Sequence, residues 1–207
     1  MRFGIFIYDG VEPIDLATFG VLSMARRIAP EIEICTIAPS AGPVALANGL
    51  KVSADFGIDD APSCDLVIVT GGAGWPVQAQ APATLDYIRR VHASGRIASV
   101  CTGGMILAAS GILDHGAATT KREVVPPETP PIEVMRATYP QVDVRETMLV
   151  DTGTVVTGGG VTLCIDTTLY LIATMLGQRV ADETARIMEY QRAWRANREG
   201  FAPVLAK

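Results

Sequence analysis

The sequence predicts an α/β protein with a mainly parallel sheet that is covered by helices on both faces. Short apolar runs such as residues 3–8 and 65–70, which are typical of strands buried on both sides, alternate with segments of helical periodicity. Glycine-bearing turns directly follow several of these predicted strands. Parallel sheets of this kind hold ligands beyond the carboxyl ends of their strands. The residues that follow the strands are therefore the first candidates for a functional site.

The first quarter of the chain supports this fold element by element. Residues 3–8 form an apolar strand, and an apolar-periodic helix follows from Asp15 to about residue 28. A second strand covers residues 32–38. The dipeptide Asn48-Gly49 favours the positive φ angles of a tight turn, so we expect a hairpin around it.

The middle of the chain repeats the alternation of strand and helix. The buried strand at residues 65–70 leads into the turn Gly71-Gly-Ala-Gly74, and a helix follows at residues 82–94. The next strand begins at Arg96 and ends at Cys101, where a glycine-bearing helix starts.

The last part of the chain opens with a proline-rich segment at residues 124–131. Proline removes amide donors and restricts the residue before it, so this segment is a loop, which we place over the site. Residues 147–156 are predicted to form a hairpin. An apolar helix follows to about Leu176, and an amphipathic last helix covers residues 179–194.

Length, composition and charge narrow the class of protein. The 207 residues are 49% hydrophobic and contain no linker, repeat or low-complexity segment, so we expect a single domain over residues 1–207. A net charge of −5 without a basic cluster argues against nucleic-acid binding. Neither a signal peptide nor a membrane-spanning stretch is recognisable. We therefore expect a cytoplasmic protein with no nucleic-acid or membrane partner.

The four cysteines show no CxxC or Cys/His spacing, which argues against structural zinc and against a disulfide framework. Cys35 and Cys164 lie in apolar segments and Cys64 precedes a strand, so we expect these three to act as small hydrophobic residues. Cys101 differs because it stands at the bend between a strand and a helix. Such a bend exposes the side chain near the positive helix terminus, which favours the thiolate, and it frees backbone N–H groups to hold developing negative charge. The sequence thus predicts that Cys101 is a nucleophile.

A thiol nucleophile needs a partner that exchanges protons. His92 lies at the polar end of a surface helix, and His115 lies about a helix length from Cys101, so a Cys-His pair is poorly supported. Asp15 follows the first strand and should lie at the same edge of the sheet as Cys101. It could equally be a helix N-cap, and the local sequence leaves both interpretations open. Gly71 to Gly74 lack the GxGxxG spacing of a dinucleotide site, so no cofactor is implied.

Five motifs follow one another along the chain: Tyr8-Asp-Gly-Val-Glu-Pro-Ile-Asp15-Leu, Val69-Thr-Gly-Gly-Ala-Gly74, Ser99-Val-Cys-Thr-Gly103, Ala118-Thr-Thr120 and Thr157-Gly-Gly-Gly-Val-Thr-Leu-Cys-Ile-Asp166. In this order they resemble the DJ-1/PfpI superfamily over nearly the whole chain. The likeness is strongest to its isocyanide hydratase branch and to the amidotransferase-like domains at the front of some AraC-type regulators.

The resemblance implies a flavodoxin-like (class I glutamine amidotransferase-like) three-layer sandwich with a nucleophile elbow at Cys101 and with Asp15 beside its sulfur. It also implies that backbone N–H groups of Gly72 and Thr102 hold negative charge in the manner of an oxyanion hole. Gly159 and Gly160 would line the same pocket, although turn geometry alone also explains glycine there.

One position departs from the family pattern. Many superfamily members carry a histidine directly after the pair that matches Thr119-Thr120, where this chain has Lys121. A histidine-assisted mechanism is therefore in doubt, whereas chemistry through Cys101 and Asp15 is not. Lys121 would favour the thiolate if it faced the site, and it would otherwise be solvated.

The resulting hypothesis is an isocyanide hydratase-like lyase that acts on a small molecule through a Cys101 thioimidate, without cofactor or metal. The alternatives are a small-molecule sensor domain and other superfamily chemistry, such as glyoxal hydration or amide hydrolysis. Regulator relatives carry a helix-turn-helix extension, whereas this sequence ends at Lys207, which favours the enzyme. The superfamily implies a homodimer.

Overall fold

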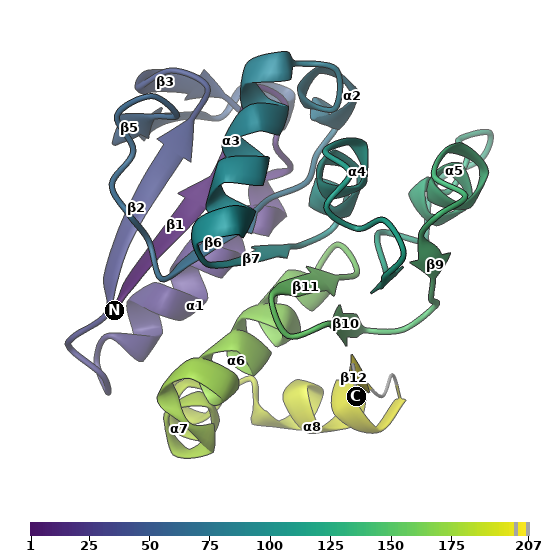
Figure 1. Cartoon of the computed structure of the whole chain (residues 1–207). Helices are drawn as coiled ribbons and strands as arrows, with labels where there is room; N and C mark the ends of the chain where they lie inside the picture. Colours follow the sequence, from purple (N-terminus) through teal and green to yellow (C-terminus); the bar gives the residue numbers. More distant parts are fainter. Residues whose placement is uncertain (201–202, 206–207) are drawn as a thin grey trace.

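The apolar runs form one eight-stranded sheet in the computed structural model, which describes residues 1–200 and 203–205 (Figure 1). Neighbouring strands are parallel except for one antiparallel pair, β10 and β11. The predicted domain boundary at Lys207 lies outside the described residues. Across the sheet the strands are β12 (Val204–Leu205), β10 (Leu149–Asp151), β11 (Val155–Gly158), β7 (Arg96–Ser99), β6 (Leu66–Val69), β1 (Arg2–Phe6), β2 (Glu33–Ala38) and β5 (Phe56–Gly57).

The order of the strands positions the candidate site. The chain adds β2 on one side of β1 and then crosses to add β6 on the other side, so its winding direction reverses between β1 and β6. Ligands in such sheets bind at this reversal, beyond the carboxyl ends of the strands. Asp15 follows β1, Gly71 follows β6, and Cys101 follows the adjacent strand β7. The fold therefore brings these three residues to one edge of the sheet.

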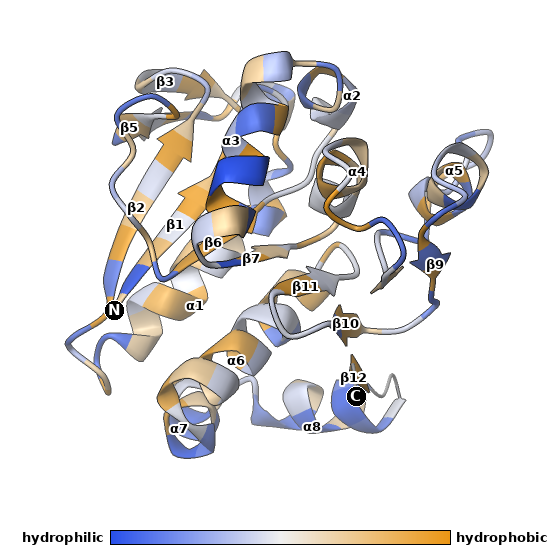
Figure 2. Ribbon diagram, viewed as in Figure 1, coloured by the Kyte–Doolittle hydropathy of each residue, from blue (hydrophilic) through white to orange (hydrophobic). Residues whose placement is uncertain are grey.

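Helices cover both faces of the sheet, which confirms the predicted α/β class (Figure 1). Figure 2 shows that apolar residues dominate the central strands and α6, whereas hydrophilic residues are concentrated on parts of α3 and on α7 and α8. The buried core joins side chains from Phe3 in the first strand to Trp194 near the end of the chain. One face carries α1 (Ala17–Ala25), α6 (Leu163–Leu176) and α7 (Gln178–Ile187), and the other carries α2 (Trp75–Gln78), α3 (Pro82–Ser94) and α4 (Gly103–Ala109).

Two predicted hairpins are confirmed. The first joins β3 (Gly42–Ala45) and β4 (Lys51–Ala54) through a short 3₁₀ turn, η2 (Ala47–Gly49). Asn48 and Gly49 adopt φ angles of 58° and 86°, which are the positive angles that this dipeptide favours. The second hairpin joins β10 and β11.

The prediction of one last helix over residues 179–194 was wrong. The chain instead forms α7 and α8 (Gln191–Gly200), and Glu189 between them has a φ of 56°. The amphipathic pattern continues across the break, so periodicity alone did not reveal it. The break lets α8 fold back: Tyr190 and Asn197 both donate hydrogen bonds to the Asp166 carboxylate of α6.

One helix and several short elements were not predicted from the sequence. Helix α5 (Pro131–Thr138) begins directly after the proline-rich loop, with Pro131 in the first turn, where a missing N–H costs little. Strands β8 (Ala117–Ala118) and β9 (Asp143–Val144) form a small separate sheet. A 3₁₀ turn, η1 (Pro13–Leu16), precedes α1, which ends at Ala25 rather than near residue 28. None of the helices in the described part of the chain has the length and apolar character needed to cross a membrane.

Candidate active site

Asp15 lies in η1 and is completely buried. Its Oδ2 accepts a hydrogen bond of 2.6 Å from the backbone N–H of Gly71, while Oδ1 has no hydrogen-bond partner among the described residues. The N-cap position of α1 is Leu16, and no side chain caps that helix. The N-cap interpretation of Asp15 is therefore wrong. A buried carboxylate with one free oxygen is instead available for proton transfer.

Cys101 stands at the predicted bend between β7 and α4, with a φ of 52°. This left-handed conformation is unfavourable for a residue with a side chain and persists only where the surroundings impose it. Here the Cys101 N–H donates to the Gly159 carbonyl at 3.1 Å, and the Thr120 hydroxyl donates to the Cys101 carbonyl at 2.8 Å. Both backbone groups of Cys101 are thus fixed, which orients its side chain.

Glycines allow the neighbouring chain segments to approach the thiol closely. A Cβ on Gly160 would lie 2.7 Å from the Cys101 Sγ, and a Cβ on Gly71 would lie 2.9 Å from the Cys101 Cβ. After the bend, a Cβ on Gly103 would lie 2.2 Å from the Val69 carbonyl oxygen. Each value is shorter than a real Cβ contact, so a side chain at any of these positions would force Cys101 or its helix to move.

The two predicted oxyanion donors lie beside Cys101 but differ in what they contact. The Gly72 N–H donates to the Thr102 hydroxyl at 2.8 Å. The Thr102 N–H hydrogen-bonds the Cys101 sulfur and thereby lowers the pKa of the thiol. Thr102 thus contributes both a backbone donor at the sulfur and a side chain that holds the Gly72 turn. Their action on a reacting substrate stays a prediction, as does the pocket-lining role of Gly159 and Gly160.

Burial dominates the titration of Cys101. Burial, and after it the Asp15 charge, raise the pKa of the thiol to about 12, against smaller lowering effects from Thr102 and Lys121. The thiol is only 2% exposed. The expectation that the bend favours a thiolate is therefore wrong for this structure, because desolvation outweighs the helix terminus and the amide.

Burial also raises the pKa of Asp15, to about 7. The Gly71 amide opposes this rise, the Glu12 charge adds to it, and Cys101 and Lys121 lower the pKa by smaller amounts. The acid and the thiol thus shift each other's pKa. Near neutral pH the thiol keeps its proton, while Asp15 is close to half protonated.

Lys121 occupies the position where the family pattern has a histidine. Its ammonium group donates to the Glu123 carbonyl, and its charge lowers the pKa of both Asp15 and Cys101. Among charged groups, Asp15 raises and Lys121 lowers the Cys101 pKa. No cluster of three or more potential metal-ligating side chains occurs within residues 1–200 and 203–205.

Sequence reasoning did not assign roles to Gly71, Thr120 and Tyr8. Gly71 anchors Asp15, and Thr120 fixes the Cys101 backbone. Tyr8 is buried, and its hydroxyl donates a hydrogen bond to the Thr70 carbonyl at 3.0 Å. Burial raises the pKa of Tyr8 well above its usual value, and the charges of Asp15 and Cys101 add to this rise. All three lie in the motifs quoted above, which was the available signal. Their roles depend on contacts between distant segments, which the motifs did not reveal.

Comparisons with known proteins agree with this geometry. The sequence profile of the DJ-1/PfpI family matches residues 1–174. The chain is 29% identical to the isonitrile hydratase of Pseudomonas putida, covering 92% of this chain and 78% of that protein. It is 31% identical to the HTH-type transcriptional regulator CdhR of Pseudomonas aeruginosa, covering 68% of this chain but only 40% of the regulator.

A solved structure supports the fold. The crystal structure of a ThiJ/PfpI family protein from Pseudomonas syringae matches with a TM-score of 0.79 at 24% identity, covering 91% of this chain and 74% of that chain. The likeness confirms the flavodoxin-like sandwich expected from the sequence.

Proposed function

The chain belongs to the DJ-1/PfpI family, and within it we propose an isocyanide hydratase-like enzyme that converts an isocyanide and water into an N-substituted formamide. The observation that carries the proposal is the coupling of the Cys101 thiol to the buried Asp15 carboxyl, whose pKa is raised to about 7. The similarity to an isonitrile hydratase over 92% of this chain supports the same reaction.

The first half of the proposed reaction forms a covalent intermediate. The Cys101 sulfur attacks the terminal carbon of the isocyanide, and Asp15 in its carboxylate form accepts the thiol proton as the C–S bond forms. The same acid then delivers that proton to the isocyanide carbon, which gives a neutral thioimidate, R–N=CH–S–Cys101. Asp15 is suited to both transfers because a group with a pKa near the working pH gives and accepts protons readily.

The second half releases the product. Asp15 accepts a proton from water as the oxygen attacks the thioimidate carbon and delivers this proton to the substrate nitrogen, and it then accepts the second proton of that water from the new hydroxyl group. The resulting tetrahedral intermediate carries charge on oxygen, which the N–H groups of Gly72 and Thr102 would stabilise. The C–S bond then breaks, the formamide leaves, and the proton returns to Cys101. Cys101 and Asp15 are regenerated, so the reaction needs neither an oxidant nor a cofactor.

The direct test is to incubate the purified protein with an aryl isocyanide and to follow formamide by liquid chromatography and mass spectrometry. We expect catalytic turnover and, after rapid acid quenching, a protein adduct on Cys101 with the mass of the isocyanide. Cys35→Ser is the matched control, because it removes a thiol outside the site and should leave turnover unchanged. Unchanged isocyanide with an unmodified Cys101 would contradict the proposal.

A sensor function is the second candidate, and the similarity to CdhR favours it. The chain spans less than half of that regulator, so the regulator's activity cannot be transferred as a whole. A sensor would bind isocyanides reversibly and release them unchanged. An enzyme would produce formamide in the wild type and lose this activity in Cys101→Ala. A substrate panel with a glyoxal and an amide separates hydration of isocyanides from the other chemistry of the superfamily.

We also propose a homodimer in solution. Light scattering coupled to size-exclusion chromatography should give twice the 21.9 kDa mass of the chain. A mass equal to that of one chain would contradict this proposal.

A further inference from the structure

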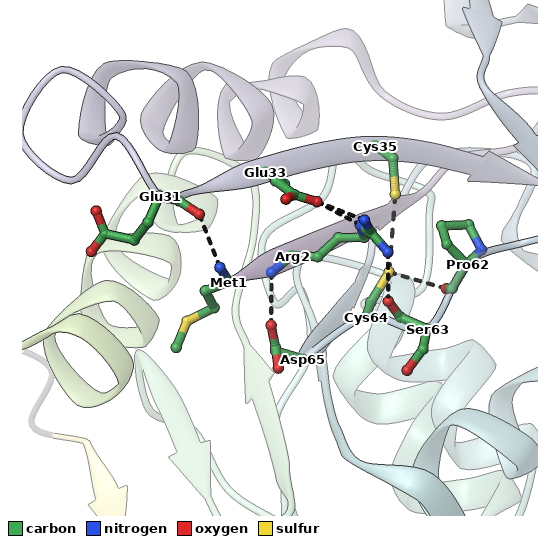
Figure 3. Close-up of polar contacts among 9 residues, drawn as sticks. All are labelled: Met1, Arg2, Glu31, Glu33, Cys35, Pro62, Ser63, Cys64 and Asp65. Carbon is green, nitrogen blue, oxygen red and sulfur yellow. Dashed lines mark hydrogen bonds and ion pairs between the residues drawn. The ribbon is translucent and has the colours of Figure 1, made fainter.

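Two further thiols, those of Cys35 and Cys64, lie close together and apart from Cys101. Cys35 is on β2, and Cys64 is in the segment that precedes β6, so both lie toward the amino ends of strands (Figure 3). Cys101 instead follows the carboxyl end of β7. The sulfurs of Cys35 and Cys64 are 3.9 Å apart. The mechanism proposed above uses neither of them.

Gly4 makes this approach possible. Strand β1 lies between β2 and β6, and its residue Gly4 is the register partner of Cys35. A Cβ on Gly4 would lie 3.0 Å from the Cys64 Sγ and 2.8 Å from a terminal carbon of Ile37. Any larger residue would occupy the space into which Cys64 extends. The absence of a side chain on β1 therefore allows the Cys64 sulfur to approach the sulfur of β2.

The two thiols are not equivalent. Cys35 is 7% exposed, whereas Cys64 is only half-buried. A hydrogen bond with the Cys35 thiol lowers the pKa of Cys64, and the Arg2 charge lowers it as well. Burial and the Asp65 charge raise the Cys64 pKa, but the net shift is downward. The same hydrogen bond and burial raise the pKa of Cys35. Cys64 is thus the more accessible sulfur and has the lower pKa of the two, so it loses its proton, which it shares with the Pro62 carbonyl at 3.4 Å, more readily than Cys35.

Arg2 is held in place beside this pair. Its guanidinium donates to the Glu33 carboxylate at 2.7 and 2.9 Å and to the Ser63 carbonyl at 3.3 Å, next to Cys64 (Figure 3). Its backbone N–H donates to the Asp65 carboxylate at 2.7 Å. These bonds fix a cation between β2 and the segment that carries Cys64.

We propose that Cys64 and Cys35 form a peroxide-reactive modification site that closes to an intramolecular disulfide. The Cys64 thiolate attacks one oxygen of hydrogen peroxide, the O–O bond breaks, and Cys64 becomes a sulfenic acid while the other oxygen leaves as water after protonation. The Cys35 sulfur then attacks the Cys64 sulfur, displacing a second water and forming the S–S bond. Two thiols are oxidised and one peroxide is reduced to two waters.

The segment that carries Cys64 can make the movement that this bond requires. A disulfide needs a sulfur separation of about 2.05 Å, shorter than the present 3.9 Å. Residues 61–64 have no regular secondary structure, so this segment can shift toward β2 without breaking a strand. The bond would tie β2 to the start of β6 across β1. The inference does not depend on the proposed hydratase function, because it uses no residue of that site.

The experiment treats the Cys101→Ala variant of this chain with a small excess of hydrogen peroxide, so that the thiol of the proposed active site cannot react. Peptide mapping without reduction should show one linked peptide containing Cys35 and Cys64, and the protein should lose two free thiols. Cys164 is completely buried and serves as the internal control, which should stay reduced. The absence of a Cys35–Cys64 link after peroxide treatment would overturn the proposal.

Single variants in the same background test the assigned order of attack. In Cys35→Ser, the sulfenic acid on Cys64 has no resolving thiol and should be trapped by a 1,3-diketone probe. In Cys64→Ser, the probe should leave Cys35 unlabelled. Arg2→Gln should slow the loss of thiols several-fold, and Arg2→Lys should restore part of the rate. Equal labelling of Cys35 and Cys64 in the two variants would overturn the assignment of Cys64 as the reactive sulfur.

Discussion

The two thiol sites of this chain lie at opposite ends of one sheet and differ in how each sulfur is made reactive. Cys101 is 2% exposed, has a left-handed backbone conformation and lies beside a buried acid. Cys64 is half-buried and lies beside the fixed cation of Arg2. Burial and a carboxylate disfavour a standing thiolate at Cys101, so that sulfur depends on a proton transfer during the reaction. The comparison teaches that a reacting thiol can depend either on a proton acceptor or on a nearby cation.

Removal of the nucleophile should have the largest effect. Cys101→Ala should reduce formamide production to the uncatalysed background, because no covalent intermediate can form. Cys35→Ser and Cys64→Ser should retain wild-type kcat and KM for the isocyanide. Steady-state kinetics of the three variants would measure the contrast. Equal losses in all three would mean that the two sites are not functionally separate.

Removal of the acid should have the next largest effect. Asp15→Asn should lower kcat/KM by about 10²–10⁴-fold, the usual contribution of general acid–base catalysis. In the wild type, kcat/KM should rise with pH through about 7, because the carboxylate form of Asp15 must accept the thiol proton. The residual activity of Asp15→Asn should lack this rise. A pH profile of both proteins would check the assignment, and a rise retained in the variant would rule out Asp15 as its source.

The same substitution should increase the stability of the fold. The pKa of Asp15 is raised from 3.8 to about 7, so the folded state binds the proton more tightly than the unfolded state. Asp15 therefore lowers the stability of the wild type as pH rises between these values, and Asp15→Asn removes this contribution while leaving that of Asp166 in place. The variant should gain up to about 4 kcal/mol in the free energy of unfolding at pH 8, and little at pH 4. Urea unfolding at the two pH values measures this gain; a gain independent of pH would not fit a buried acid.

The smallest effect is expected at Lys121. Its charge lowers the pKa of both Asp15 and Cys101, and the side chain is only partly buried. Lys121→Met should move the pH midpoint of kcat/KM upward and reduce the rate at neutral pH only a few-fold. Arg122→Met, at the adjacent position, is the matched control. An equal shift of the midpoint in both variants would show a general charge effect rather than a specific one.

The sequence predicted most of the architecture because its main signals are local. Buried strands, the Asn48-Gly49 turn and the bend at Cys101 all arise from neighbouring residues, and the structure has each of them. Strand order then explains why Asp15 and Cys101 meet at one edge. The break at Glu189 was missed because the amphipathic pattern continues through it, and the contacts that follow the break, from Tyr190 and Asn197 to the distant carboxylate of Asp166, are not visible in the local sequence.

The titration of the site could not be predicted in the same way. A strand-to-helix bend suggested a low thiol pKa, but the pKa depends on how completely distant segments exclude water. Gly160 and Gly71, from two different segments, pack against Cys101, and the Gly71 amide anchors Asp15. These contacts are properties of the assembled fold. The Cys35–Cys64 pair was missed for the same reason, since Gly4 on an intervening strand brings the two sulfurs together.

The coupling of Cys101 to Asp15 is the central claim, and the pH dependence of Cys101 alkylation tests it most directly. The measurement uses proteins that carry Cys35→Ser and Cys64→Ser, with a small alkylating agent at about pH 7 to 10, where the rate follows the thiolate fraction. The Asp15 charge raises the pKa of Cys101, so adding Asp15→Asn should lower that pKa and speed alkylation at each pH. Identical rate profiles with and without Asp15→Asn would contradict the account.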